Sequence, residues 1–412
     1  MDVLLLDQGR QSLPFLRALK KMGHHVVIVC LSRFSEGYFS RYPDRRLIWP
    51  NYNTNPEGFR NRLFEYLERH TPDVTLSVGD VSAEIIANNR ERILRYTNVT
   101  VPPREVFYMA KDKIKTMAYC MENDVPCPRT YFADNNSYEG IISRLSFPVM
   151  VKPSRGIGAI GLRRFDNYGD LKMYLAQGNF RSEDLLIQEY IPQENGMQYQ
   201  AEAFLDAESH MKVCMVMEKP RFFPVTGGTS TANLTVSRPD IVATTRRLLE
   251  GIGWTGAADV DYIMDPRDNI PKVIEINPRV TAGIKIGFAA GIDYADLHLR
   301  LASGLPIPRI DSYALGVYSR NILMDVLWYF QASRTMRKNT QPSFFKFFGP
   351  RVIEQTFSIK DPFTMLGFFL HMVLKFSGKN VWREKMGSSS SVEHLSSANF
   401  TRTQTGKKGL TG

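Results

Sequence analysis

Cysteines are scarce in this sequence, and hydrophobic stretches long enough to cross a membrane are absent. The 4 cysteines among 412 residues are scattered without metal-ligand spacing, so we expect reduced thiols rather than a metal site. No stretch of about 18 apolar residues occurs, and the segment after Met1 lacks the basic and apolar parts of a signal peptide. These absences predict a cytoplasmic protein without a spanning helix.

Dense runs of lysine and arginine interleaved with aromatic residues are also missing, although the chain as a whole is basic. Its net charge is +10 and its isoelectric point is near 9.3. A basic balance favours anionic partners, which include nucleic acid, a membrane surface and anionic substrates. Because no basic and aromatic run stands out, we expect no nucleic-acid partner. The 43% apolar and 23% charged residues are ordinary for a globular protein of two or three domains.

The first 105 residues alternate short apolar runs with helical patterns. This alternation is typical of an α/β domain with a parallel sheet. The turn after the first run lacks the complete glycine pattern of a dinucleotide site. We therefore expect an N-terminal α/β domain over residues 1–105 that does not bind a dinucleotide. Its expected elements are strands at 2–6, 25–31 and 73–78 and a helix at 13–22.

The middle of the chain contains an unusual hairpin. Two apolar-flanked runs, 258–264 and 272–279, are separated by a segment dense in turn formers. Glu275 and Asn277 project from one face of their strand because side chains alternate along a strand, and Asp261 on the facing strand can point to the same side. Two carboxylates and one amide suit a hard divalent cation held together with phosphates. The alternative interpretation is a hairpin with a polar outer face.

A lysine followed by a glycine-rich segment stands at the end of another apolar run. Lys152 ends the expected strand 147–153 and precedes Gly156, Gly158 and Gly161. The lysine can reach phosphate, and the glycines let backbone N–H groups approach anionic oxygens. The order differs from that of the phosphate loop in which the lysine follows the glycines. The segment therefore predicts either a phosphate site or a plain hairpin loop.

Two further segments acquire meaning only from their order along the chain. Lys113 lies early in a helical pattern at 111–123, and Glu189 lies at the end of the apolar run 185–190. A strand end can present backbone groups to a purine ring, and Glu189 can accept from an exocyclic amine. Taken alone, each segment is an ordinary helix start or strand end. The remaining expected elements are strands at 200–205 and 211–217 and helices at 241–252 and 292–303.

The order of these segments resembles that of the ATP-grasp superfamily, in its carbamoyl-phosphate-synthetase-like branch. The segments are the helix lysine, the strand lysine with its glycines, the Gln-Glu-Tyr-Ile-Pro strand end and the hairpin. The resemblance covers about residues 1–305, and its most specific part is 274–279. It implies an α/β protein in which an N-terminal Rossmann-like pre-ATP-grasp domain precedes a two-lobed α+β ATP-grasp fold. The second domain is expected over 106–310, with its small lobe at about 115–190.

The resemblance also implies a nucleotide site, with ATP as the bound nucleotide. The phosphate contacts of the family fall on two lysines, and its adenine contacts fall on the strand end. A ribose contact falls on Gln198, where the family usually has an acid. Gln can still hydrogen-bond a hydroxyl, and Glu194 is the substitute candidate. The residues implied for the nucleotide are Lys113, Lys152, Gly156, Gly158, Gly161, Glu189, Tyr190, Ile191 and Gln198.

The metal set and one arginine complete the implied active site. Asp261, Glu275 and Asn277 match the family ligands of Mg²⁺, or of Mn²⁺ in its place. Arg279 matches the arginine that stabilises the acyl-phosphate step, and Lys152 neutralises charge on the transferring group. Transfer of the ATP γ-phosphoryl group turns a carboxylate into a mixed anhydride, which an amine then attacks. The resemblance thus implies an ATP-dependent carboxylate–amine ligase that makes an amide or peptide-like bond.

These residues do not identify the substrates. A small-molecule carboxylate and an amine are implied, with cell-envelope or polysaccharide metabolism as one setting. Segments 156–161 and 222–229 are candidate lids, and Lys219 and Arg221 are candidate contacts for an anionic substrate. The alternative function is a nucleotide-binding regulatory or scaffold protein with an ATP-grasp fold. Phosphate release with pooled acceptors discriminates between the two hypotheses.

The composition changes from about residue 311. Aromatic residues become frequent, and we expect a mainly helical, aromatic-rich extension over 311–386. Its apolar run 363–376 is too short to span a bilayer. It can lie on a membrane surface, or pack against the ligase body or against a partner in a homodimer. Residues 387–412 are rich in Ser, Thr, Gly and Lys and are expected to be disordered.

Overall fold

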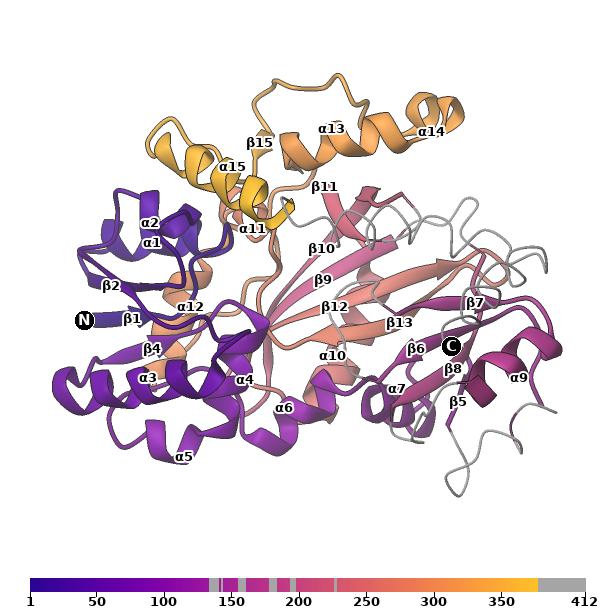
Figure 1. The fold of residues 1–412 in the computed structure, drawn as a ribbon, viewed down its shortest axis with the longest axis horizontal. Coiled ribbons are helices and arrows are strands. Elements are labelled where there is room, and N and C mark those ends of the chain that lie inside the picture. The colour runs from indigo at the N-terminus through magenta and orange to yellow at the C-terminus, as the bar shows by residue number, and fades with distance from the viewer. Residues whose placement is uncertain are drawn as a thin grey trace, which may run out of the picture.

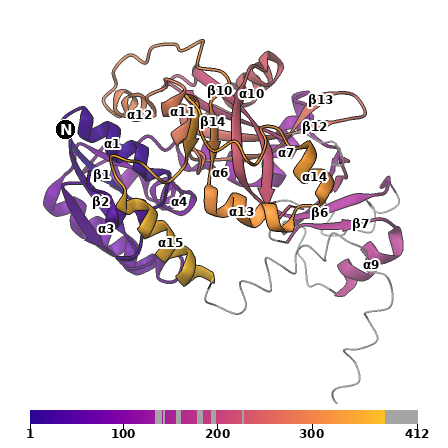
Figure 2. The same ribbon diagram turned by 90° about the horizontal axis from the view of Figure 1, so that it is seen from above.

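The computed structural model of the chain arranges its strands in three sheets (Figure 1). An N-terminal α/β unit lies at one end, a seven-stranded sheet lies in the centre, and a small four-stranded sheet lies at the other end. The C-terminal helices run along one side of this row, which faces the viewer in Figure 2. The structure describes residues 1–132, 141, 144–154, 161–177, 184–192, 198–225 and 228–376.

The N-terminal unit is a parallel sheet with strand order β3-β2-β1-β4, as its alternating pattern predicts. Strands β1, β2 and β4 are buried on both faces because helices cover both. Helix α1 packs on one face through Leu16, and α3 packs on the other through Leu63. The elements are β1 (Asp2–Leu5), α1 (Ser12–Lys21), β2 (His25–Cys30), α2 (Glu36–Phe39), β3 (Arg45–Ile48), α3 (Pro56–His70), β4 (Val74–Leu76), α4 (Asp80–Asn88) and α5 (Arg90–Ile93).

The small sheet is antiparallel, with strand order β5-β8-β6-β7. The helix expected at 111–123 is α7 (Lys113–Glu122), and a separate helix, α6, ends just before it, so that the two meet at Asp112. The carboxylate of Asp112 caps the second helix by accepting from the N–H of Ile114, which makes Lys113 its first residue. The elements are α6 (Arg104–Lys111), α7 (Lys113–Glu122), β5 (Thr130–Tyr131), β6 (Val149–Pro153), β7 (Arg163–Phe165), α9 (Tyr168–Gln177) and β8 (Leu185–Glu189).

The central sheet has strand order β13-β12-β9-β10-β11-β14-β15. The expected pairs of antiparallel strands, 200–205 with 211–217 and the 258–279 hairpin, are confirmed. The elements are β9 (Gln198–Leu205), β10 (Met211–Phe223), β11 (Thr229–Val236), α10 (Pro239–Gly251), β12 (Gly256–Asp265), β13 (Ile270–Asn277), α11 (Lys285–Ala289), α12 (Tyr294–Ala302), β14 (Tyr318–Arg320) and β15 (Val352–Glu354).

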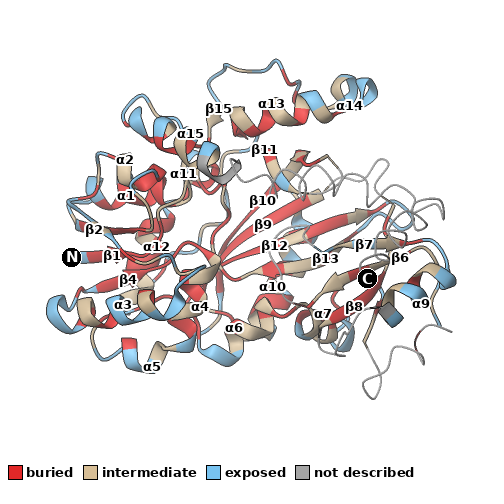
Figure 3. Ribbon diagram, viewed as in Figure 1, coloured by how far each residue is buried: buried red, intermediate tan, exposed pale blue. Residues whose placement is uncertain are grey.

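The two faces of the central sheet differ in chemistry. One face carries Ala201, Val260 and Ile276, which pack against the apolar side of α10. Side chains alternate along each strand, so the intervening residues point to the opposite face. That face carries Glu202 and Asp259, both of which are buried, as the red strands of Figure 3 illustrate. A buried polar face is therefore built into the centre of the molecule.

Residues 311–376 join the central sheet through β14 and β15, and their helices lie at its side. The helices are α13 (Ile322–Gln331), α14 (Arg334–Asn339) and α15 (Phe363–Phe376). Helix α15 lies against α2 of the N-terminal unit, where the carboxylate of Asp361 accepts from the hydroxyl of Ser40 at 2.6 Å. No helix among the described residues is long and apolar enough to cross a membrane. The expectation of disorder for 387–412 lies outside the described residues.

Candidate active site

The β12–β13 hairpin places the three expected metal ligands on the buried polar face. Asp261 lies directly opposite Glu275, and Asn277 lies directly opposite Asp259. On the next strand, β9, Glu202 lies opposite Asp259. The structure thus brings the predicted set together and adds two carboxylates to it.

Three lysines surround these carboxylates. The amine of Lys113 is 3.0 Å from Oε2 of Glu275, and the amine of Lys219 contacts Oδ1 of Asp261. Lys152 donates to Oε1 of Gln188 at 2.6 Å on the neighbouring strand β8. The start of α7 is held next to β6 because the N–H of Lys113 donates to the carbonyl of Ser154 at 2.9 Å. The two lysines expected at the phosphates therefore approach the hairpin from the small sheet.

Burial and charge shift several pKa values in this cluster. Burial lowers the pKa of Lys152 to about 8, although the charge of Glu275 opposes this shift. Burial raises the pKa of Glu202 well above its usual value, and the charge of Asp259 raises it further. Burial and the charge of Asp261 raise the pKa of Asp259 to about 7. The raised pKa values of Glu202 and Asp259 have burial and neighbouring carboxylates as their causes, and a bound cation would oppose both.

Arg279 connects the hairpin to the N-terminal unit. Its guanidinium donates to Oδ2 of Asp259 at 2.9 Å, to Oδ2 of Asp80 at 3.2 Å and to Oδ1 of Asn277 at 3.1 Å. Burial alone lowers the pKa of Arg279, but the two carboxylates outweigh burial and raise it. The planar group is therefore fixed at the edge of the metal set, where α4 begins at Asp80.

A divalent cation fits the oxygen donors of this face. Oδ1 of Asp259 and Oε1 of Glu202 are buried carboxylate oxygens without a hydrogen-bond partner within the described ranges. Oxygen donors of this kind suit Mg²⁺, which takes one or two carboxylates together with phosphate oxygens. In the part of the chain that the structure describes, no three His, Cys, Asp or Glu side chains are arranged to hold a metal by themselves. The set thus requires Asn277 and oxygens from a ligand.

The expected adenine end lies where β8 ends. The N–H of Tyr190 donates to the carbonyl of Pro148, and the guanidinium of Arg164 lies 4.3 Å from the centre of the Tyr190 ring. Ile191 is buried. The side chain of Glu189 accepts from the N–H of Arg129 at 2.8 Å and from Arg267 at 2.9 Å. An adenine amine would have to share or displace these partners of the Glu189 carboxylate.

Several expected nucleotide residues lie at the edge of what the structure describes. Gly161 has φ +81°, and a Cβ there would lie 2.8 Å from the ring of Pro153, so the turn beside the Lys152 strand requires glycine. Gln198 begins β9 and pairs with Ile263 of β12. The predictions for Gly156, Gly158 and Glu194 fall outside the described residues.

The structure assigns different environments to the two expected substrate contacts. Arg221 is buried and forms a two-point ion pair with Asp325 of α13, with Nε 2.7 Å and Nη2 2.9 Å from the carboxylate oxygens. Its Nη1 donates to the carbonyl of Pro342 at 2.7 Å. The prediction that Arg221 binds substrate is therefore wrong in this structure, because the side chain anchors the C-terminal extension. Lys219, two residues earlier, does face the metal set.

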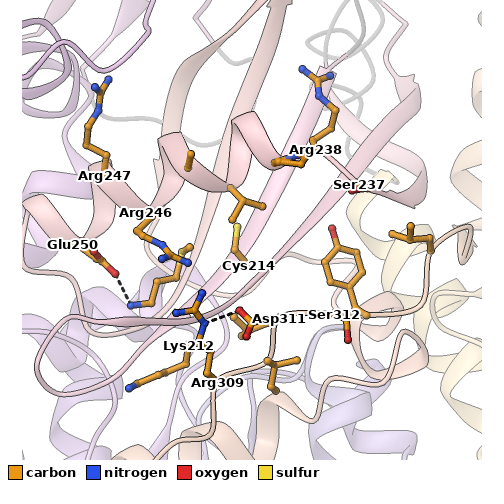
Figure 4. A pocket seen from close by; sticks show the side chains of 18 residues that line it. Lys212, Cys214, Ser237, Arg238, Arg246, Arg247, Glu250, Arg309, Asp311 and Ser312 are labelled. Carbon is orange, nitrogen blue, oxygen red and sulfur yellow. Dashed lines mark hydrogen bonds and ion pairs between the residues drawn. The ribbon is translucent and has the colours of Figure 1, made fainter.

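A separate cavity of about 630 Å³ lies beside α10 and β10 (Figure 4). It is rich in cations, but most of them have acidic partners nearby. Lys212 pairs with Asp206, and Arg309 pairs with Asp311. Because its walls come from the α10 side of the sheet, this cavity is distinct from the cluster around Glu275.

Sequence reasoning missed three charged residues of the cluster, Asp259, Glu202 and Asp80, and one contact of Lys219. Asp259 had a readable signal, since it stands two residues before Asp261 and so shares its face of the strand. Glu202 likewise interrupts an apolar strand. Asp80 and the contact of Lys219 with Asp261 had no such signal, because they depend on how separate segments pack.

The sequence matches the ATP-grasp domain family over residues 110–283. It is also 24% identical over 255 residues to a D-aspartate ligase of Enterococcus faecium, covering 56% of this chain and 60% of that protein. A carbamoyl phosphate synthase large chain of Corynebacterium glutamicum is 27% identical over 215 residues, which cover 49% of this chain and 19% of the synthase. The chain thus spans less than two thirds of the length of both relatives.

Solved structures share the fold at low identity. A biotin carboxylase domain of the Hydrogenobacter thermophilus 2-oxoglutarate carboxylase, in complex with MgADP and bicarbonate, has a TM-score of 0.64 at 17% identity and covers 77% of this chain and 73% of that one. An L-amino acid ligase from Bacillus licheniformis has a TM-score of 0.56 at 16% identity, with 73% of each chain covered. Both likenesses extend beyond residues 110–283 into the rest of the fold.

Proposed function

We propose that this protein is an ATP-dependent ligase, because residues 110–283 match the ATP-grasp domain family and the chain is similar to a D-aspartate ligase. It activates a carboxylate as an acyl phosphate and joins it to an amine. The observation that carries the proposal is the pairing of Asp261 with Glu275 beside three lysines on one buried face. That combination suits the phosphates and cation of a nucleotide rather than a hydrophobic core.

ATP lies between the small sheet and the central sheet in this proposal. Lys113 and Lys152 bind its phosphates, and the end of β8 at Glu189, Tyr190 and Ile191 receives the adenine. Asp261, Glu275 and Asn277 hold Mg²⁺, which neutralises charge on the phosphates when bound. The amine of Lys113 lies 3.0 Å from the carboxylate of Glu275, so cation and phosphate binding would exchange this ion pair for new ones.

Arg279 orients the carboxylate that is activated. A guanidinium is a planar fork that matches a carboxylate, and Asp80 and Asp259 hold this one in place. The carboxylate oxygen attacks the γ-phosphorus, ADP leaves, and the acyl phosphate forms. The amine then attacks the acyl carbon and inorganic phosphate leaves. Lys152 stabilises charge on the transferring phosphoryl group.

The decisive experiment measures phosphate release from ATP with pooled small acids and amines. Glu275→Ala is expected to abolish acceptor-dependent release. Asp268→Ala, in the exposed turn of the same hairpin, is the matched control and should retain it. Tight ATP binding without release for any pool would favour a regulatory or scaffold role instead. Release that survives Glu275→Ala would contradict the metal assignment.

We further propose peripheral membrane contact through residues 363–376. Phe363, Leu366, Phe369 and Val373 of α15 are exposed, although other side chains of this helix are buried against α2. The acids of residues 326–376 are Glu354 and Asp361, both of which accept hydrogen bonds. Lysines and arginines stand at 334, 337, 338, 346, 351, 360 and 375. An apolar stripe within a basic surface suits anionic lipid.

Liposome co-sedimentation tests this contact on the full chain. The wild type should pellet with vesicles of phosphatidylglycerol, and a Phe363→Ser, Phe369→Ser double variant should stay in the supernatant. Neutral phosphatidylcholine vesicles are the control. Equal pelleting of wild type and double variant would remove the membrane proposal. A homodimer through the same stripe is the competing occupant, and a shift in molar mass of the double variant by light scattering would favour it. A cytoplasmic location stays a prediction.

A further inference from the structure

Buried polar atoms without partners gather where the C-terminal strands join the central sheet. Gln355 follows β15 and is 1% exposed, yet neither its amide oxygen nor its amide nitrogen has a hydrogen-bond partner within the described residues. The hydroxyl of Thr356, the hydroxyl of Ser319 and the amide nitrogen of Asn321 share this state. Such groups cost folding free energy unless something else pairs with them.

By alternation along β11, β14 and β15, Ser319 and Gln355 lie on the same face of the sheet as the metal set. Ser319 of β14 lies directly opposite Asn233 of β11, and both are buried. Gln355 continues the neighbouring strand, where its N–H donates to the carbonyl of Arg320 at 2.9 Å. The loop that follows Arg279 connects the two regions.

That loop crosses the polar face from β9 to β11. At its start, the N–H of Thr281 donates to Oε2 of Glu202 at 2.9 Å, and its hydroxyl accepts from Nε2 of Gln200 at 2.9 Å. At its end, a Cβ on Gly283 would lie 2.9 Å from the amide nitrogen of Asn233 and 3.4 Å from that of Gln355. A larger residue would crowd both amides, so the glycine keeps them accessible beside the loop.

A cation from the N-terminal unit faces the same region. Arg10 is half-buried, and its guanidinium makes neither a hydrogen bond nor an ion pair within the part of the chain that the structure describes. The charges that act on it come from Glu36, Glu354 and Arg279. Arg279 already donates to Asp80, Asp259 and Asn277. Among the described residues, Arg10 therefore has capacity left to bind an anion.

We propose that Arg10 and Gln355 bind the organic acid that the enzyme activates, and that this acid is an amino acid. Arg10 takes an anionic group of the ligand. Gln355 offers both a donor and an acceptor, which suits an ammonium, hydroxyl or amide group next to that charge. The proposal rests on the proposed ligase function for the identity of the ligand as a substrate. The two residues come from opposite ends of the chain, and neither lies within the matched family region 110–283.

The test is designed so that binding is measured without turnover. Isothermal titration calorimetry measures the affinity of each of the common L- and D-amino acids for the full-length protein. The protein is first saturated with a non-hydrolysable ATP analogue and Mg²⁺. Gln355→Met removes both amide atoms while keeping the length of the side chain. Arg10→Gln removes the charge. The matched control is Gln341→Met, which changes an exposed glutamine of the same extension.

At least one amino acid should bind the wild type and the control equally, and bind Gln355→Met and Arg10→Gln about tenfold more weakly or worse. Affinity for the ATP analogue should not change. The melting temperature of Gln355→Met should stay level or rise, since an unpaired buried amide is removed. This combination separates a ligand contact from a structural role.

Unchanged amino-acid affinity in Gln355→Met overturns the proposal, as does the absence of binding by any amino acid to the wild type at millimolar concentrations. The proposed ligase function can fail independently. Gln355-dependent binding without phosphate release would contradict the ligase and retain this site. Normal release with an unchanged KM for the acid in Gln355→Met would retain the ligase and contradict this site.

Discussion

The two ends of the buried polar face differ in how their polar groups are satisfied. Around the hairpin most charged groups are paired: Lys113 pairs with Glu275, Lys219 with Asp261, and Arg279 with two carboxylates. Single oxygens of Asp259 and Glu202 lack hydrogen-bond partners within the described residues. Around the C-terminal strands, the amide of Gln355 lacks a partner within the described residues. Both regions are buried, so solvent exposure does not explain the difference.

We interpret this difference as a division between residues that bind the nucleotide and residues that select the substrate. At the hairpin, internal ion pairs hold the charged groups near their working positions before a nucleotide arrives, and a ligand exchanges partners with them. At Gln355, the fold keeps a buried group without a partner, which is tolerated where a ligand completes it. The hairpin lies within the ATP-grasp match at 110–283, whereas Gln355 lies in the extension. Under the two proposals, the shared fold supplies the activation step and the added strands supply the recognition.

The largest effect is expected from Arg279→Ala. It leaves Asp80 and Asp259 without their cation, and breaking a buried ion pair in this way costs about 3–5 kcal/mol of unfolding free energy. Loss of a donor at the reacting group should also reduce acceptor-dependent phosphate release by about 10²–10³-fold. Urea unfolding and phosphate release measure the two effects.

Two companion variants sharpen this prediction. Arg279→Lys should recover part of the stability but little activity, because an ammonium lacks the planar fork. Arg300→Ala removes an arginine from a half-exposed pair with Asp296 on α12 and should change stability by less than about 1 kcal/mol. Full activity in Arg279→Lys would show that only charge, and not the fork, is needed.

A second large effect is expected where the extension is anchored. Asp325→Asn removes the charge that both Arg221 and Arg320 contact, at 2.7 Å each, in a fully buried position. We expect a loss of about 3–5 kcal/mol in unfolding free energy. The matched control is Asp311→Asn, whose pair with Arg309 is exposed and should contribute less than about 1 kcal/mol. Equal losses in the two variants would mean that the buried pair does not anchor the extension.

The same contrast explains what could be read from the sequence. The hairpin was predictable because alternation within one strand places Glu275 and Asn277 on one face, and Lys113 follows an N-cap residue. The same rule would have found Asp259. These features depend on neighbours a few residues apart, which local patterns encode.

The remaining site depends on packing between distant segments. Arg221 was expected to contact substrate, but its partner Asp325 lies 104 residues later on a helix whose docking no local pattern specifies. Arg10 and Gln355 are separated by almost the whole chain. Alternation indicates which face of a strand a residue occupies, but not which strand becomes its neighbour in the sheet.

The smallest expected effect is a dependence of ATP affinity on pH, which tests the hairpin side of the comparison. Burial lowers the pKa of Lys152 to about 8, so the amine is already protonated below that pH and must take up a proton above it in order to bind phosphate. The affinity for ATP should therefore stay constant up to about pH 7.5 and weaken by up to about tenfold per pH unit above 8. Calorimetric titration in buffers of different ionisation enthalpy should detect the uptake of a proton on binding. Lys152→Arg keeps its charge at all these pH values and should flatten the profile, whereas Lys172→Met, on an exposed face of α9, should not. A wild-type profile that stays flat to pH 9 would mean that Lys152 does not carry the proton that phosphate binding requires.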